Sequence, residues 1–245
     1  MKEFVKKILK KSSLGKCIYP LVQSVYQWYS IPIKRRRLRR VGVEALMRIH
    51  SLLMDNKIDY YLQFGSLLGV IRDKDFIKHD DDIDLTVVDP LVSPQNVLRL
   101  LLENDFHFIH ALKVNEYIVD FAVSYKKLTV DFFFPIPVER EHKVGICCAY
   151  FNPSSEYERY DQNNYRVWFI PDNIRTKITR FKGIDLKIPQ DPEWLLEYIY
   201  GENWRNPIKN WSPKSITDHF QEMDDFAIRV TDVERILGRG GDGTF

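Results

Sequence analysis

The feature that constrains the fold most is a short segment in which polar and apolar side chains alternate strictly. Residues 82–87 read Asp-Ile-Asp-Leu-Thr-Val, and this period of two is typical of a β-strand with one buried face. Asp82 and Asp84 then project from the same face, while the residues between and after them enter the core. Two carboxylates so close together repel each other unless a cation lies between them. The segment therefore predicts both a strand and a candidate cation site.

The residues before this strand predict another strand that leads through a tight turn into a helix. Residues 60–64 read as a short buried strand, Gly65-Ser66 forms the turn, and a helical stretch follows over residues 67–72. Such a turn brings backbone N–H groups and a hydroxyl to the start of a helix, which suits a phosphate group. Gly65 and Ser66 are therefore candidate phosphate-binding residues.

A third carboxylate lies within the strongest strand signal of the chain. Residues 128–134 read Leu-Thr-Val-Asp-Phe-Phe-Phe and end at a proline, as a strand would. Asp131 sits in the middle of this strand, where a charge is costly unless it has a partner. A neighbouring strand would place it beside Asp82 and Asp84 as a third ligand. A site with only oxygen ligands suits Mg²⁺ or Mn²⁺ rather than zinc.

The alternative is that these carboxylates simply face water. For Asp80 and Asp81, which precede the strand, we take this view and expect a solvated acidic turn. For Asp82 and Asp84 we favour a binding site, because strand, Gly-Ser and helix followed by Asp-x-Asp on a strand is a fairly specific combination.

The remaining pattern predicts an α/β (α+β) fold, in which helices flank a mixed β-sheet. Helical spacing and capping residues predict helices over residues 43–54, 93–103, 191–200 and 216–228. Strand signals dominate residues 106–151 and return at residues 165–170 and 184–188. A length of 245 residues suits one large domain with appendages. We therefore expect a basic arm over residues 1–40, a catalytic domain over residues 41–207, and a helical extension with a loose tail over residues 208–245.

Charge is distributed unevenly along the chain. Residues 1–40 hold twelve Lys or Arg and one acidic residue, whereas the remaining 205 residues hold 24 basic and 33 acidic ones. Phe4 to Leu9 place apolar side chains on one helical face, and an aromatic stretch leads to a polybasic cluster, Lys34 to Arg40. This combination is typical of a segment that lies on an anionic membrane surface. We therefore expect a peripheral protein at the cytoplasmic, inner face of a membrane.

The arm has three alternative interpretations. A signal peptide would need a compact apolar run and a small-residue cleavage site, which the sequence lacks. Nucleic-acid binding would need the basic surface to continue over the body, which is acidic, so we expect no nucleic-acid partner. Simple packing of the arm on the core stays open. Three cysteines (Cys17, Cys147 and Cys148) are too few for a disulfide framework and indicate a reducing compartment.

Several segments resemble a known family. Residues 62–72 read LQFGSLLGVIR and residues 76–85 read FIKHDDDIDL. With residues 130–135 and 189–204, they resemble the LicD/fukutin family, which has a nucleotidyltransferase fold, and the resemblance covers roughly residues 43–207 in order. The pair Lys78-His79 before the acidic run looks closer to the fukutin side of that family.

The resemblance implies metal-dependent transfer of a phospho-alcohol group from a CDP-linked donor to a hydroxyl of a cell-surface glycan, with release of CMP. The fukutin-like pair favours a polyol phosphate such as ribitol phosphate, with phosphocholine as the other option, and the acceptor glycan is expected to be lipid-linked. The resemblance implies Mg²⁺ or Mn²⁺ held by Asp82, Asp84 and Asp131, and Asp131 would be a ligand or the general base. Substrate would be bound by Gly65, Ser66, Arg72 and His79.

Two other functions stay open from the sequence. A nucleotidyltransferase would move NMP from an NTP to a small substrate. A non-catalytic membrane-bound partner would share the fold without the reaction. The presence of the carboxylates and of the Gly-Ser turn disfavours this last hypothesis, since a partner that has lost catalysis is expected to lose its acidic residues.

Overall fold

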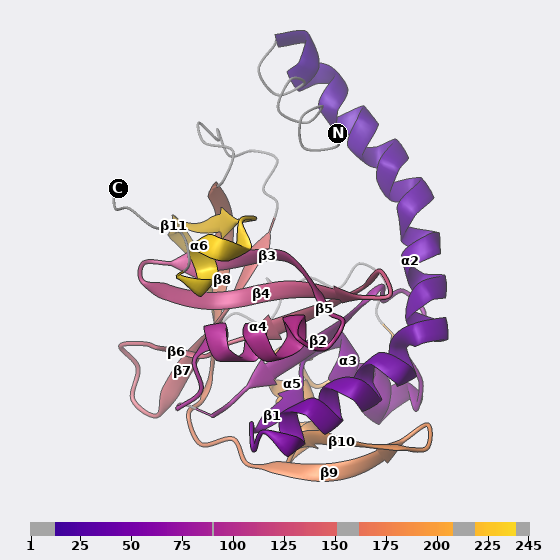
Figure 1. Ribbon diagram of the computed structural model, residues 1–245, viewed down its shortest axis with the longest axis vertical. Helices are drawn as coiled ribbons and strands as arrows, with labels where there is room; N and C mark the ends of the chain where they lie inside the picture. Colours follow the sequence, from indigo (N-terminus) through magenta and orange to yellow (C-terminus); the bar gives the residue numbers. More distant parts are fainter. Residues whose placement is uncertain (1–12, 90, 151–161, 208–218, 239–245) are drawn as a thin grey trace.

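A nine-stranded mixed sheet organises the computed structural model, which describes residues 13–89, 91–150, 162–207 and 219–238 (Figure 1). The strands lie in the order β1-β2-β5-β4-β3-β11-β8-β7-β6. β2 and β5 run parallel, and the other neighbouring pairs are antiparallel. The strand bounds are β1 Tyr60–Leu62, β2 Asp82–Val87, β3 His107–Val114, β4 Tyr117–Tyr125, β5 Leu128–Phe133, β6 Ile136–Pro137, β7 Lys143–Tyr150, β8 Gln162–Pro171 and β11 Phe220–Val230.

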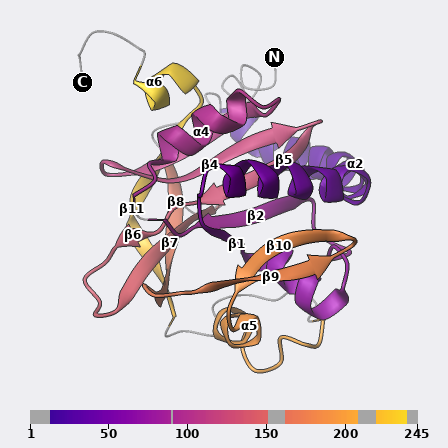
Figure 2. The ribbon, with the colours of Figure 1, turned by 60° about the horizontal axis from the view of Figure 1, so that its bottom comes forward.

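Helices and a separate hairpin surround this sheet, so the fold is the mixed α+β arrangement that the sequence predicts. The hairpin of β9 (Thr176–Phe181) and β10 (Ile184–Pro189) contacts both β1 and the helix α5 (Figure 2). The helices are α2 Ser13–Asp55, α3 Phe64–Leu68, the π-helical turn η1 Gly69–Asp73, α4 Pro94–Leu102, α5 Pro192–Tyr200 and α6 Val233–Leu237.

Most of the local predictions are confirmed. β2 covers the alternating segment, and Ile83 and Leu85 are fully buried beneath it. Ser93 caps α4 by accepting a hydrogen bond from the backbone N–H of Asn96, and Asp191 caps α5 in the same way. These short polar side chains satisfy backbone donors that the first turn of a helix leaves free.

The helix predicted over residues 216–228 is wrong from residue 220 onward, and residues 216–218 lie outside the described residues. The structure has a strand there, β11, which pairs with β3 on one side and with β8 on the other. Ala227 and Val230, which lie on opposite faces of the sheet, are both buried. Because this pairing satisfies the backbone groups of two other strands, tertiary structure overrides the local helical preference. The expected loose tail lies mostly outside the described residues.

The basic arm and the first helix predicted for the body form one helix. α2 runs without interruption from Ser13 to Asp55, across the expected boundary at residue 40. Its N-terminal half extends beyond the sheet (Figure 1), whereas Leu38 and Leu46 are buried in the core. Among the described residues, no helix is both long and apolar enough to cross a membrane. The amphipathic pattern from Phe4 to Leu9 lies outside the described residues.

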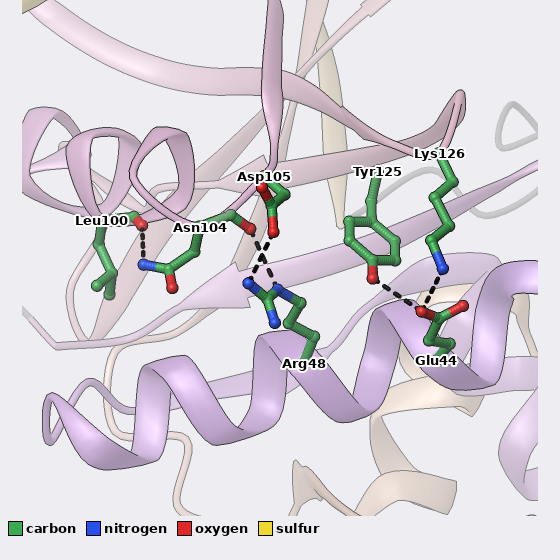
Figure 3. Close-up of polar contacts among 7 residues, drawn as sticks. All are labelled: Glu44, Arg48, Leu100, Asn104, Asp105, Tyr125 and Lys126. Atoms are coloured by element: carbon green, nitrogen blue, oxygen red, sulfur yellow. Dashed lines mark hydrogen bonds and ion pairs between the residues drawn. The ribbon is translucent and has the colours of Figure 1, made fainter.

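Polar contacts fix the C-terminal half of α2 to the body (Figure 3). Glu44 accepts hydrogen bonds from the Tyr125 hydroxyl at 2.9 Å and from the Lys126 ammonium at 2.5 Å. One turn later, the guanidinium of Arg48 pairs with the Asp105 carboxylate at 3.0 Å. α2 is therefore held against the turn between β4 and β5 and against the loop that follows α4.

Candidate active site

Acidic side chains from three neighbouring strands share one face of the sheet. In the parallel register of β2 and β5, Asp84 lies directly opposite Asp131. In the antiparallel register of β5 and β4, Asp131 lies opposite Ala122, two positions from Asp120. Because directly opposed residues project from the same face, Asp82, Asp84, Asp131 and Asp120 all point to that side.

Three carboxylates lie close enough together to bind one ion. Asp80, Asp82 and Asp84, which we call the carboxylate cluster, each offer an oxygen atom, and these atoms lie within 4.8 Å of one another. The part of the chain that the structure describes holds one such group. Asp82 and Asp84 are the pair that the strand period predicts. Asp80 is different, because we expected it in a solvated turn.

Asp80 reaches the cluster because its loop folds back and packs on Gly65. The backbone N–H of Asp80 donates a hydrogen bond to the Ile77 carbonyl at 3.1 Å. A Cβ atom on Gly65 would lie 2.4 Å from the Asp80 carboxylate, so only glycine admits this approach. The glycine was predicted to cradle phosphate. In the structure it also admits the third carboxylate, and no periodicity in the sequence signals that contact.

Burial and nearby negative charge raise the pKa of each carboxylate in the cluster. Burial, followed by the neighbouring charge of Asp82, raises the pKa of Asp80 to about 8. Burial, followed by the charges of Asp82 and Asp80, raises the pKa of Asp84 well above its usual range. The fully ionised cluster therefore calls for a positive charge. Carboxylate oxygens are the hard donors that Mg²⁺ and Mn²⁺ prefer, so the residues present fit such an ion.

Asp131 lies beside the cluster rather than in it. It faces Asp84 across the strand register, but the three grouped carboxylates do not include it. Burial, followed by the charges of Asp120 and Asp82, raises the pKa of Asp131 well above its usual range. The third carboxylate of the cluster is thus Asp80, whereas the sequence predicted Asp131 beside Asp82 and Asp84.

Ser66 connects the turn to the strand that carries the cluster. Its hydroxyl oxygen accepts a hydrogen bond from the backbone N–H of Asp84 at 2.9 Å. α3 begins at Phe64, three residues before the helix predicted from residue 67, so Gly65 and Ser66 lie in its first turn. The predicted phosphate-binding residues are therefore placed next to the carboxylates.

The other two predicted substrate residues lie at the edge of this region. The Arg72 guanidinium pairs with the Asp73 carboxylate at 2.6 Å and donates a hydrogen bond to the Trp204 carbonyl at 3.4 Å. His79 is exposed and precedes Asp80 directly. His79 therefore lies beside the carboxylate cluster because it is the neighbour of Asp80 in the chain. Arg72 instead contacts the segment that follows α5.

Three residues that the sequence did not single out for the site belong to this region. Burial, followed by the charges of Asp84 and Asp80, raises the pKa of Tyr200 well above its usual range, so its phenol lies near the cluster. Asp120 is 5% exposed, and its Oδ1 atom has no hydrogen-bond partner among the described residues. Gln63 is fully buried, and within the same described set its side-chain amide also has none.

The strand register places the Gln63 side chain on the acidic face. Its backbone N–H donates to the Asp84 carbonyl at 3.0 Å, which continues the pairing of β1 and β2 by one residue. A fully buried amide with both polar atoms unsatisfied is unusual away from a binding site. No period or motif distinguishes Gln63 or Asp120 from ordinary strand residues.

Comparison with known proteins identifies the domain. The sequence model described as "LicD/FKTN/FKRP, nucleotidyltransferase domain" matches residues 57–191, which include every residue of the carboxylate cluster. The chain is 26% identical to an uncharacterized protein of Rickettsia prowazekii (strain Madrid E) over 209 residues, which cover 80% of this chain and 70% of that protein. It is 33% identical to an uncharacterized protein of Rickettsia typhi over 60 residues, 23% of this chain and 19% of that protein.

Proposed function

Because the chain belongs to the LicD/FKTN/FKRP family, whose membership suggests a transferase, we propose that it transfers a phospho-alcohol group. The donor is a CDP-linked alcohol, the acceptor is a hydroxyl of a cell-surface glycan, and the leaving group is CMP. The transferred group is a polyol phosphate such as ribitol phosphate, or phosphocholine. The observation that carries the proposal is the carboxylate cluster, whose three carboxylates lie within 4.8 Å of one another in the matched domain.

The proposed reaction is a displacement at phosphorus. The acceptor hydroxyl oxygen forms a bond to the phosphorus that carries the alcohol. The bond from this phosphorus to the oxygen bridging it to CMP breaks, and CMP leaves with the electron pair. When bound to Asp80, Asp82 and Asp84, Mg²⁺ or Mn²⁺ would neutralise charge on the diphosphate.

We propose that Asp131 is the general base that takes the proton from the acceptor hydroxyl. A general base must lie beside the reacting group and have a pKa close to the working pH. Asp131 lies opposite Asp84 but outside the carboxylate cluster, and its raised pKa makes it a better proton acceptor than an exposed aspartate. This position favours the base over the ligand among the two roles that the sequence left open.

Substrate binding is assigned to the residues around the cluster. Gly65 and Ser66 lie in the first turn of α3 next to Asp84, where N–H groups and a hydroxyl suit phosphate oxygens. His79 is exposed beside the cluster, where it can reach the donor. Arg72 is assigned to hold the Trp204 segment over the site and to contact a donor oxygen.

We further propose that the N-terminal part of the arm attaches the protein to the inner, anionic face of a membrane, where a lipid-linked glycan would be its acceptor. The six lysines among residues 1–29 support this assignment. Each is worth about 1 kcal/mol when it lies near an anionic surface. We assign a smaller share of the membrane contact to the polybasic cluster, because several of its side chains contact the body.

The test is a product assay with the full chain and Mg²⁺. Separate reactions contain CDP-ribitol, CDP-glycerol, CDP-choline, CTP or another NTP, each with a glycan acceptor. Release of CMP together with a glycan that gains the mass of the phospho-alcohol supports the proposal and names the donor. Release of pyrophosphate from an NTP, with a product that gains NMP, would favour a nucleotidyltransferase. No product from any donor would favour the non-catalytic hypothesis.

A further inference from the structure

We propose that helix α2 has a positioning role in the active site, because its basic residues hold the loop that supplies Asp80. This loop, residues 78–81, is called the acidic loop below. The inference rests on the proposed function in one respect, namely that the carboxylate cluster binds a divalent cation. α2 lies outside the matched domain of residues 57–191.

Three consecutive contacts join α2 to the acidic loop. The Lys34 ammonium pairs with the Asp81 carboxylate at 2.9 Å. The Arg35 guanidinium donates to the His79 carbonyl at 3.1 Å, and the Arg39 guanidinium donates to the Lys78 carbonyl at 3.2 Å.

The spacing of these residues follows from the helix. Residues 35 and 39 are four apart, and positions four apart lie above one another on one helical face. Lys34 is the neighbouring position on the same side, so three basic side chains meet one stretch of four loop residues. A fourth contact comes from the same polybasic cluster. The Arg37 guanidinium donates to the Lys127 carbonyl at 2.8 Å and fixes the helix to the β4–β5 turn.

The contacts are placed to set geometry rather than to supply stability. The Lys34 side chain is 41% exposed and that of Asp81 is 25% exposed, and ion pairs at such positions contribute little to folding. Asp80 lies between two anchored loop residues, His79 and Asp81, and it is the cluster member that does not belong to β2. A loop that supplies a metal ligand needs such outer contacts, because the ligand must be held before the ion arrives.

A positive charge at Lys34 also acts on the site directly. Its charge lowers the pKa of Asp82 and of Asp131, although burial outweighs it in both cases. Lys34 therefore lies near the acidic face as well as the loop. A helix that the sequence assigns to a membrane arm thus contacts the loop that supplies Asp80.

Matched pairs of substitutions test this inference in the full chain. The double variant Arg35→Gln/Arg39→Gln removes two contacts to the acidic loop, and the control Arg36→Gln/Arg40→Gln removes two exposed charges from the same helix. Mn²⁺ binding is measured by electron paramagnetic resonance, and hydrogen exchange is measured at the amides of residues 79–82. We expect the first double variant to bind Mn²⁺ about tenfold more weakly than the control, with faster exchange in the loop and an unchanged melting temperature.

A second pair separates position from charge. Lys34→Gln is expected to weaken Mn²⁺ binding, and Lys34→Arg is expected to restore it. Equal affinity and equal exchange in the two double variants would overturn the proposal. Tighter Mn²⁺ binding by Lys34→Gln would overturn it for Lys34, because that residue would then act as a competing charge. If the wild type binds no Mn²⁺, the proposed function fails, whereas loop exchange still decides whether α2 holds the loop.

Discussion

At the scale of single residues, the site depends on how a strand and the loop before it bring three carboxylates together. Asp82 and Asp84 share a strand face by the period of two, and Asp80 comes from the preceding loop through the space left by Gly65. The alternating sequence pattern predicts the first arrangement. The second depends on a contact between residues fifteen positions apart in the chain, so no local pattern reveals it.

Replacing Asp84 by asparagine should abolish turnover and leave the fold intact. The change removes one charge at nearly constant volume from a group that is repelled by Asp82 and Asp80. A bound metal ion contributes several kcal/mol of charge stabilisation, so the expected loss in rate is about 100-fold or more. Rate and circular dichroism are measured together. A near-normal rate with a native spectrum would contradict the assignment of the carboxylate cluster.

The variant Asp131→Asn should show whether Asp131 acts as the general base or as a metal ligand. Because Asp131 lies outside the cluster, the variant should keep its affinity for Mn²⁺ while kcat falls by about 100-fold, a typical contribution of a general base. A titration with Mn²⁺ and a rate measurement check both parts. If Mn²⁺ affinity falls as far as it does in Asp84→Asn, Asp131 is a metal ligand instead.

Gly65→Ala should damage the site through Asp80. The new Cβ would lie 2.4 Å from the Asp80 carboxylate, and overpacking of this kind costs about 1–3 kcal/mol. We expect lower stability and weaker Mn²⁺ binding. In an Asp80→Ala background the stability cost should shrink, since the clashing atoms are gone. Equal costs of Gly65→Ala in the two backgrounds, by chemical denaturation, would argue against this contact.

At the scale of elements, local signals located the strands and caps but not the long-range pairing. Ser93 and Asp191 start their helices as capping chemistry predicts, and β2 and β5 lie where alternation and an apolar run place them. β11 was missed because its strand state comes from pairing with β3 and β8. The Gln63 amide, which has no hydrogen-bond partner among the described residues, was missed for a similar reason, because burial on the acidic face is a property of the assembled sheet.

Two truncations test whether residues 1–29 serve membrane attachment while residues 30–40 serve the active site. Deleting residues 1–29 should release the protein from anionic vesicles and spare activity on a soluble acceptor, because the body contacts described above begin at Lys34. Deleting residues 1–40 should in addition reduce activity and stability, since it removes Lys34 and the buried Leu38. Vesicle sedimentation, activity and melting temperature are compared for both. Equal activity after both deletions would show that residues 30–40 serve only the arm.

At the scale of the whole molecule, the raised pKa of Asp80 links stability to pH. A carboxyl whose pKa is higher in the folded state than in the unfolded state favours folding below its unfolded pKa, and this contribution is lost as pH rises through the folded pKa. For Asp80 the folded value is about 8. The metal-free protein should therefore lose stability between about pH 4, the unfolded value, and pH 8. Asp80→Asn should show a shallower loss in thermal melts over that range, and an identical pH dependence would refute the coupling.

Binding of Mn²⁺ to the full chain measures whether the carboxylate cluster of this LicD-family domain holds a divalent cation. Electron paramagnetic resonance is used to count bound Mn²⁺ in the wild type and in Asp84→Asn. We expect one Mn²⁺ per chain, displaced by Mg²⁺ and lost in the variant. Absence of binding in the wild type, or binding that Asp84→Asn leaves unchanged, would contradict the account.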